Sequence, residues 1–184
     1  PEDIDFVILT HLDWDHAAGI VEQGPDGLRL RFPKALHMIN AIEWHDAHNP
    51  NSRTQNTYWA QNWELLVQSG RYELVEESAE VVPGVRVKRT GGHTRGHMIV
   101  ELAGAKETAY HLADLLPTHA HLNPLWVTAY DNFPLDSVAQ KERWLATAKD
   151  QRAWLLFYHD ALYAAIRLNT LGDISETVER SWNE

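Results

Sequence analysis

The sequence predicts an α/β fold, because short apolar runs of strand length alternate with a few helical segments along all 184 residues. A chain of this length can bury one substantial core, and no internal repeat or low-complexity tract interrupts the alternation. No stretch has the composition of a linker. We therefore expect a single domain over residues 1–184.

The predicted strands are short apolar runs, several of them bounded by glycine or proline. The first, Ile4–Thr10, is almost entirely apolar and rich in β-branched residues, which favours a strand buried on both faces. The last two flank His159 and Asp160 and are expected to be joined through a functional turn. The other predicted strands are Ala35–Ile39, Tyr72–Glu76, Val85–Arg89, Met98–Leu102, Thr108–Leu112, Trp154–Tyr158 and Leu162–Leu168.

Helical segments are fewer than strands. Asp15–Val21 is expected to open a helix after the first strand, and Ala41–His48 a second one. The polar and irregular residues 49–61 then predict a long surface loop.

The clearest predicted helix is Asp136–Asp150. Pro134 precedes it, and either Asp136 or Ser137 can cap its first turn. Helical spacing places three of its apolar residues on one face, which we expect to be buried. These residues are Val138, Leu145 and Ala148.

Composition excludes several classes of function. Asp and Glu outnumber Lys and Arg by 26 to 16, and the formal net charge of −10 repels phosphate backbones and anionic membranes. No apolar stretch approaches the ~20 residues of a membrane helix, and the absence of cysteine excludes disulfides and thiolate chemistry. We therefore expect neither a nucleic-acid nor a membrane partner, and we favour a cytoplasmic location.

The strongest chemical signal is Thr-His-Leu-Asp-Trp-Asp-His at residues 10–16, directly after the first strand. Four potential metal ligands occupy six positions there, namely His11, Asp13, Asp15 and His16. Imidazole and carboxylate groups together suit Zn²⁺, Mn²⁺ or iron. A polar turn with an aspartate helix cap is the alternative, but the density of ligands after an apolar strand favours a metal site.

Three later residues fit the same purpose. His93 lies in the glycine-rich segment 91–97, where backbone can approach a metal closely. Asp114 follows one predicted strand, and His159 follows another. Each alone has a simple structural explanation, such as a turn histidine or a capping aspartate, but their joint order favours a common site.

In this order the motifs resemble those of the metallo-β-lactamase superfamily, whose pattern is H-x-H-x-D-H, then G-H-T-x-G-H, then Asp, then His. The segment Asp114–Thr118, followed by Trp126 and by Tyr130-Asp131, is similar to the branch of quorum-quenching lactonases and methyl parathion hydrolase-like enzymes. The resemblance implies an αββα sandwich that lacks its N-terminal strands, because only one strand precedes the first motif. It also implies a processed or truncated piece whose exposed sheet edge invites a homodimer.

The resemblance further implies two divalent metal ions, with zinc first and Mn or Fe as alternatives. The implied ligands are His11, Asp13 and His93 for one ion, Asp15, His16 and His159 for the other, and Asp114 as the bridge. Asp13 departs from the family pattern, which has histidine there. It either holds the ion with softened Lewis acidity or is too short to reach, which leaves that site weak or empty.

These expectations predict a hydrolase in which a metal-bridging hydroxide attacks a small lactone or ester, such as an acyl-homoserine lactone. Asp15 is the expected catalytic residue, because it can orient the nucleophile and pass a proton to the leaving group. Two alternatives stay open. A carboxylate at the second motif position also suits a di-iron redox centre of the flavodiiron type, and the Asp13 change also suits a metal-stabilised domain without catalysis.

Other residues carry weaker expectations. Support for the imidazoles is expected from Thr10, Thr94 and Asp160. Structural or supporting roles are expected for His97, His119 and His121. Solvent-facing positions are expected for His37, His45 and His48. An apolar substrate mouth, or else ordinary core or interface packing, is expected for Trp14, Trp126, Tyr130 and Phe133.

Overall fold

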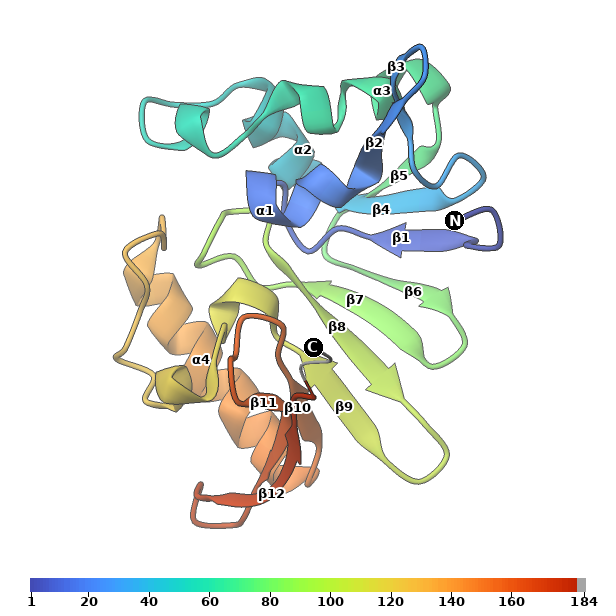
Figure 1. Cartoon of the computed structure of the whole chain (residues 1–184). Helices are drawn as coiled ribbons and strands as arrows, with labels where there is room; N and C mark the ends of the chain where they lie inside the picture. The colour runs from blue at the N-terminus through green and yellow to red at the C-terminus, as the bar shows by residue number, and fades with distance from the viewer. Residues whose placement is uncertain (182–184) are drawn as a thin grey trace. The chain divides into compact units, whose positions relative to one another are not determined.

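The computed structural model describes residues 1–181 and divides into two compact units, residues 1–77 and residues 78 onward. Both units mix helices and strands, as the sequence predicts (Figure 1). The first unit holds a three-stranded sheet and a two-stranded hairpin, and the second holds a seven-stranded sheet. The expectation of a single domain over the whole chain stays a prediction.

The three-stranded sheet of the first unit has the order β1-β4-β5 and is parallel throughout. Its strands are β1 (Phe6–Ile8), β4 (Leu36–Asn40) and β5 (Tyr72–Val75). The prediction that the first strand is buried on both faces is wrong, because β1 lies at the sheet edge and Phe6 is 39% exposed. Figure 1 shows β1 and β4 side by side.

Two helices of the first unit follow their strands as predicted. Helix α1 (Trp14–Ala17) continues into a 3-10 turn over Ala18–Ile20. Helix α2 (Ala41–His48) begins directly after β4, because the side chain of Asn40 accepts hydrogen bonds from the backbone N–H groups of the first turn. This cap explains why the predicted bounds of α2 are correct.

Several elements of the first unit have no counterpart in the prediction. A hairpin joins β2 (Val21–Gly24) to β3 (Gly27–Leu30), and its Gly-Pro-Asp-Gly turn is a recognisable sequence signal. Helix α3 (Glu64–Ser69) follows the loop, which itself contains two short 3-10 turns. Those turns span Thr54–Asn56 and Ala60–Asn62. The core of this unit consists of Leu9, Leu12, Ala17, Ile20, Ile39, Ala47, Tyr58, Trp63 and Leu66.

The sheet of the second unit has the order β12-β11-β10-β9-β8-β7-β6 and is antiparallel except for the β9–β10 pair. Five of its strands match the predicted ones to within two residues, whereas β6 and β12 were not predicted. Every residue of β12 is exposed, so its sequence carries no apolar run. The bounds are β6 (Ser78–Val82), β7 (Val85–Arg89), β8 (Met98–Ala103), β9 (Thr108–His111), β10 (Trp154–Leu156), β11 (Tyr163–Leu168) and β12 (Ile174–Glu179).

Helix α4 (Pro134–Asp150) lies in the chain between the parallel strands β9 and β10 and contacts β11 (Figure 1). It begins at Pro134, whose fixed φ suits the first helical position, so the predicted cap at Asp136 or Ser137 is wrong. The predicted face is only partly correct, since Val138 and Leu145 are half-buried. The buried stripe has helical spacing and consists of Ser137, Lys141, Trp144 and Ala148.

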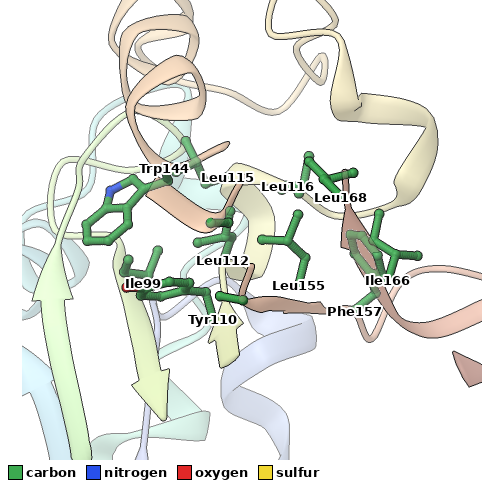
Figure 2. Close-up of a cluster of buried hydrophobic side chains, with 12 residues drawn as sticks. Ile99, Tyr110, Leu112, Leu115, Leu116, Trp144, Leu155, Phe157, Ile166 and Leu168 are labelled. Atoms are coloured by element: carbon green, nitrogen blue, oxygen red, sulfur yellow. The ribbon is translucent and has the colours of Figure 1, made fainter. Parts of the chain in front are cut away.

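The core of the second unit lies between α4 and the sheet. Figure 2 shows Trp144 of α4 near Tyr110 and Ile99, and the rings of Trp144 and Tyr110 have centroids 5.4 Å apart. The cluster consists of Ile99, Tyr110, Leu112, Leu115, Leu116, Trp144, Ala148, Ala153, Leu155, Phe157, Ile166 and Leu168. Across the part of the chain described, no helix combines the length and the apolar character that crossing a membrane requires.

Candidate metal centre

The seven predicted ligands fall into two groups, four in the first unit and three in the second. The first group lies on the segment between β1 and α1. His11 and Asp13 are buried, with His11 Nε2 3.9 Å from Asp13 Oδ2. The rings of His11 and His16 have centroids 3.9 Å apart, and His16 Nε2 lies 3.2 Å from Asp15 Oδ2. The structure therefore brings all four donors of the first motif together.

Local hydrogen bonds give this segment its shape. The carbonyl of Asp13 accepts from the backbone N–H groups of His16 and Ala17, which starts α1. The N–H of Trp14 donates to the carbonyl of Thr57 across 2.8 Å. Thr10 Oγ1 lies 3.1 Å from His11 Nδ1, as expected of a residue that supports an imidazole.

Glu43 is a functional candidate that the sequence reasoning missed. Glu43 is almost fully buried, and its carboxylate accepts a hydrogen bond from the backbone N–H of Leu12, a residue of the first motif. The hydroxyl of Tyr58 donates to the same oxygen across 3.0 Å. Burial, together with the negative charges of Glu43 and Asp13, raises the pKa of Tyr58 well above its usual range, so this phenol stays a hydrogen-bond donor.

Asp114 is the centre of the second group. Its Oδ2 lies 3.5 Å from Nε2 of His93, and its Oδ1 lies 3.4 Å from Nε2 of His159. The hydroxyl of Tyr158 donates to Oδ1 across 3.1 Å. Each carboxylate oxygen therefore faces a different imidazole, which is the arrangement that a carboxylate bridging two ions requires.

The backbone before two of these ligands has unusual conformations. Gly92 has φ +87°, and a Cβ there would lie 2.7 Å from the side-chain oxygen of Ser137 in α4, so only glycine fits. Ala113 has φ 48°, a conformation that costs a non-glycine residue roughly 1–2 kcal/mol. The structure thus holds backbone strain one residue before Asp114.

Asp131 is a second residue that the sequence reasoning did not identify as functional. Its Oδ1 lies 2.9 Å from Nδ1 of His93, although 38 positions separate the two residues. A carboxylate only accepts hydrogen bonds, so Nδ1 carries the proton and Nε2 keeps its lone pair. Sequence could point to Asp131 only through the resemblance of the Tyr130-Asp131 pair to the lactonase branch.

Asp160 fixes the turn that follows His159. Its carboxylate accepts from the backbone N–H groups of His119, Leu162 and Tyr163 and contacts His119 Nδ1 at 2.5 Å. Burial raises the pKa of Asp160, but these hydrogen bonds outweigh it and lower the pKa to about 2. Its imidazole partner is thus His119, and not one of the predicted ligands.

The remaining histidines divide between structural and exposed positions. The prediction that His37 faces solvent is wrong, because it is 0% exposed within β4 and its Nδ1 lies 3.0 Å from the carbonyl oxygen of Arg71. His45 and His48 are exposed, as predicted. Nδ1 of His97 and of His121 each lies 2.8 Å from a threonine hydroxyl, which fits the structural roles expected for them.

The aromatic residues near the motifs do not pack in the core. These residues are 39% to 73% exposed, which excludes packing in the core of this chain. The set consists of Trp14, Trp126, Tyr130 and Phe133. Three of these belong to the segment before α4 that contains Asp131. An apolar surface therefore adjoins the second group of ligands along the chain.

Comparison with known proteins identifies relatives, although no model of a protein family matches the chain. An N-acyl homoserine lactonase from a Bacillus species is 30% identical over 97 residues, which cover 53% of this chain and 32% of the lactonase. The chain spans about a third of the length of this curated relative.

Solved structures match over the whole chain. A probable metal-dependent hydrolase from Staphylococcus aureus is 39% identical with a TM-score of 0.93, and the match covers 100% of this chain and 65% of the hydrolase. The dizinc quorum-quenching lactonase AidC, solved with the product N-hexanoyl-L-homoserine, gives a TM-score of 0.79 at 18% identity, over 100% of this chain and 66% of AidC. The likeness to AidC concerns the fold. Together these matches confirm the predicted fold class.

Proposed function

We propose that this chain, whose motifs resemble the metallo-β-lactamase superfamily and whose fold matches solved metal-dependent hydrolases, is a dinuclear metal-dependent hydrolase of a small lactone or ester. The observation that carries the proposal is the position of Asp114 between His93 and His159, with one oxygen toward each imidazole. A carboxylate that bridges two ions would have a histidine ligand of each ion beside one of its oxygens, as Asp114 has here.

The chemistry of the donor set fits two divalent ions. Four imidazoles and three carboxylates give a ligand charge of −3 when the imidazoles are neutral, and two divalent cations contribute +4. The ions and their ligands together would then carry a charge of +1, which a bound hydroxide brings to zero. The proposed ligands are His11, Asp13, Asp15 and His16 from the first unit with His93, Asp114 and His159 from the second.

Zinc ions, when bound, would polarise the substrate carbonyl and lower the pKa of a water molecule toward neutrality. The chain's own residues would orient and protonate the reactants. Asp15 lies in the first turn of α1 beside His16, where its carboxylate would orient the nucleophile and pass the nucleophile's proton on to the leaving alkoxide. Asp13 would add negative charge at the position where the family pattern has histidine. This charge would make the ion that it binds a weaker Lewis acid.

Exposed aromatic residues favour a substrate with an apolar part. Trp126 and Tyr130 are more than half exposed and lie on the segment that supplies Asp131. Apolar surface next to a few polar groups is typical of small-molecule sites. We propose that this segment contacts the apolar portion of the lactone or ester.

Elemental analysis of the purified chain, paired with a panel of a lactone, an aryl ester and a phosphotriester, tests the proposal. We expect two zinc or manganese ions per chain and turnover of the lactone or aryl ester that a chelator abolishes and added zinc restores. Iron with oxygen consumption would instead support the di-iron alternative. Stoichiometric metal without turnover on any of the three substrates would support a metal-stabilised domain without catalysis.

A further inference from the structure

We propose that Asp131 is a positioning residue that fixes the His93 imidazole for metal binding through Nε2 and connects this ligand to the aromatic segment 126–133. The metal-binding part of this inference rests on the proposed function. The orientation of the imidazole does not, since it can be measured without any metal.

The hydrogen bonds of Asp131 occupy both of its oxygens. Oδ1 accepts from Nδ1 of His93 at 2.9 Å and from the hydroxyl of Thr128 at 3.2 Å, while Oδ2 accepts from the backbone N–H of Thr128 at 3.2 Å. The Asp131 side chain is 3% exposed, so water competes little for these bonds. This geometry leaves Nε2 of His93 facing Asp114, at 3.5 Å from Oδ2.

Backbone hydrogen bonds join the same two segments. The N–H of Asn132 donates to the carbonyl of His93, and the N–H of Phe133 donates to the carbonyl of Gly92, both across 2.9 Å. Gly92 also approaches the first turn of α4 too closely to carry a side chain. The loop that carries His93 is therefore held against the aromatic segment by main chain and side chain together.

Lys141 of α4 secures the other end of the aromatic segment. Its side chain is almost fully buried, and its ammonium group donates to the carbonyl of Trp126. Burial lowers the pKa of Lys141, and the negative charge of Asp131 opposes this shift, which places the two groups in one electrostatic neighbourhood. The segment is thus anchored at Trp126 by the helix and at Asp131 by the metal ligand.

This connection predicts that Asp131 sets the affinity for metal without touching it. A carboxylate that accepts the second ring N–H of a ligating histidine fixes its tautomer and raises its basicity, and its loss weakens metal binding about 10–100-fold. The Asp131→Asn variant of the full chain should therefore bind zinc 10–100-fold more weakly in a chelator competition. Asp136→Asn is the matched control, because Asp136 is an exposed carboxylate on α4 and should leave the affinity unchanged.

A second variant tests the same role with a smaller change, because it leaves the Asp131 carboxylate in place. Thr128→Val keeps the carboxylate but removes the hydroxyl that donates to Oδ1 and accepts from the backbone N–H of Tyr130, so its zinc affinity should fall between those of the wild type and Asp131→Asn. Equal zinc affinity in Asp131→Asn and wild type would overturn the positioning role in metal binding.

Nitrogen-15 chemical shifts of the His93 ring in the metal-free chain provide the readout that needs no metal. The wild type should show the Nδ1–H tautomer alone, and Asp131→Asn should show a mixture of both tautomers. An unchanged single tautomer in the variant would overturn the inference. A chain that binds no zinc but loses its tautomer preference in Asp131→Asn would refute the proposed function and leave the positioning role intact.

Discussion

The backbone N–H of Leu12 donates a hydrogen bond to the Glu43 carboxylate across 2.9 Å, although 31 positions separate these residues. Leu12 lies between His11 and Asp13, so the bond fixes the peptide that carries both proposed ligands. Glu43 belongs to α2 and is almost fully buried. One buried acceptor thereby helps to hold the segment that carries both proposed ligands.

Replacing Glu43 should destabilise the fold. In Glu43→Ala, the N–H of Leu12 and the hydroxyl of Tyr58 lose their acceptor, and we expect the free energy of unfolding to fall by about 2–3 kcal/mol. Glu43→Gln keeps an acceptor oxygen and should lose less. Urea denaturation measures both, with exposed Glu73→Ala as the control that stays within about 0.5 kcal/mol of wild type. Equal stability of Glu43→Ala and the control would contradict this role.

Removing the proposed bridge should remove both ions. Asp114→Ala loses the carboxylate whose two oxygens face His93 and His159, so neither ion keeps a complete ligand set. We expect the zinc content to fall from two ions per chain to fewer than one and hydrolysis to disappear. Asp150→Ala, at the exposed end of α4, is the control that should keep both. Full zinc stoichiometry in Asp114→Ala would show that the assignment is wrong.

Placing a histidine at position 13, where the family pattern has one, should not reduce activity. Asp13→His replaces a buried carboxylate next to His11 by a neutral ligand, which leaves more positive charge on the proposed ion. We expect kcat of the zinc-loaded variant on a lactone or aryl ester to equal or exceed that of wild type. A collapse of kcat at unchanged zinc content would mean that the carboxylate has a chemical role of its own.

His37 should make the chain less stable in mild acid. Burial lowers its pKa in the folded state below 6.5, so between that folded value and about 6.5 the unfolded chain binds more protons than the folded one. The stability that the neutral His37 side chain contributes is therefore fully present above about pH 6.5. It is lost as the pH falls through this window.

The His37→Gln variant isolates this contribution, because the amide can donate to the Arg71 carbonyl but does not titrate. Its free energy of unfolding should fall less than that of wild type between pH 7.5 and 5.5, measured by urea denaturation. Exposed His45→Gln should behave like wild type. Identical acid sensitivity of His37→Gln and wild type would contradict the role of burial.

Local signals account for the parts of this protein that were predictable. Helix α2 has its predicted bounds because Asn40 caps it, and β7 has its predicted bounds because a glycine turn and a glycine-rich loop flank its alternating apolar residues. The dense ligands of residues 10–16 likewise lie in one short segment, where a single stretch of sequence reveals them. Elements with weak local patterns, such as the fully exposed β12, were missed.

The sequence by itself determined the α/β class, the principal strands and helices, and which side chains can serve as ligands, since these follow from spacing and chemical type along the chain. Tertiary structure alone decided that Glu43 supports Leu12, that Asp131 holds His93 and that His37 is buried. The physical reason is that a buried polar group forms its hydrogen bonds with the groups that tertiary packing places beside it. Residues 31 or 38 positions apart share no local sequence pattern from which their contact could be predicted.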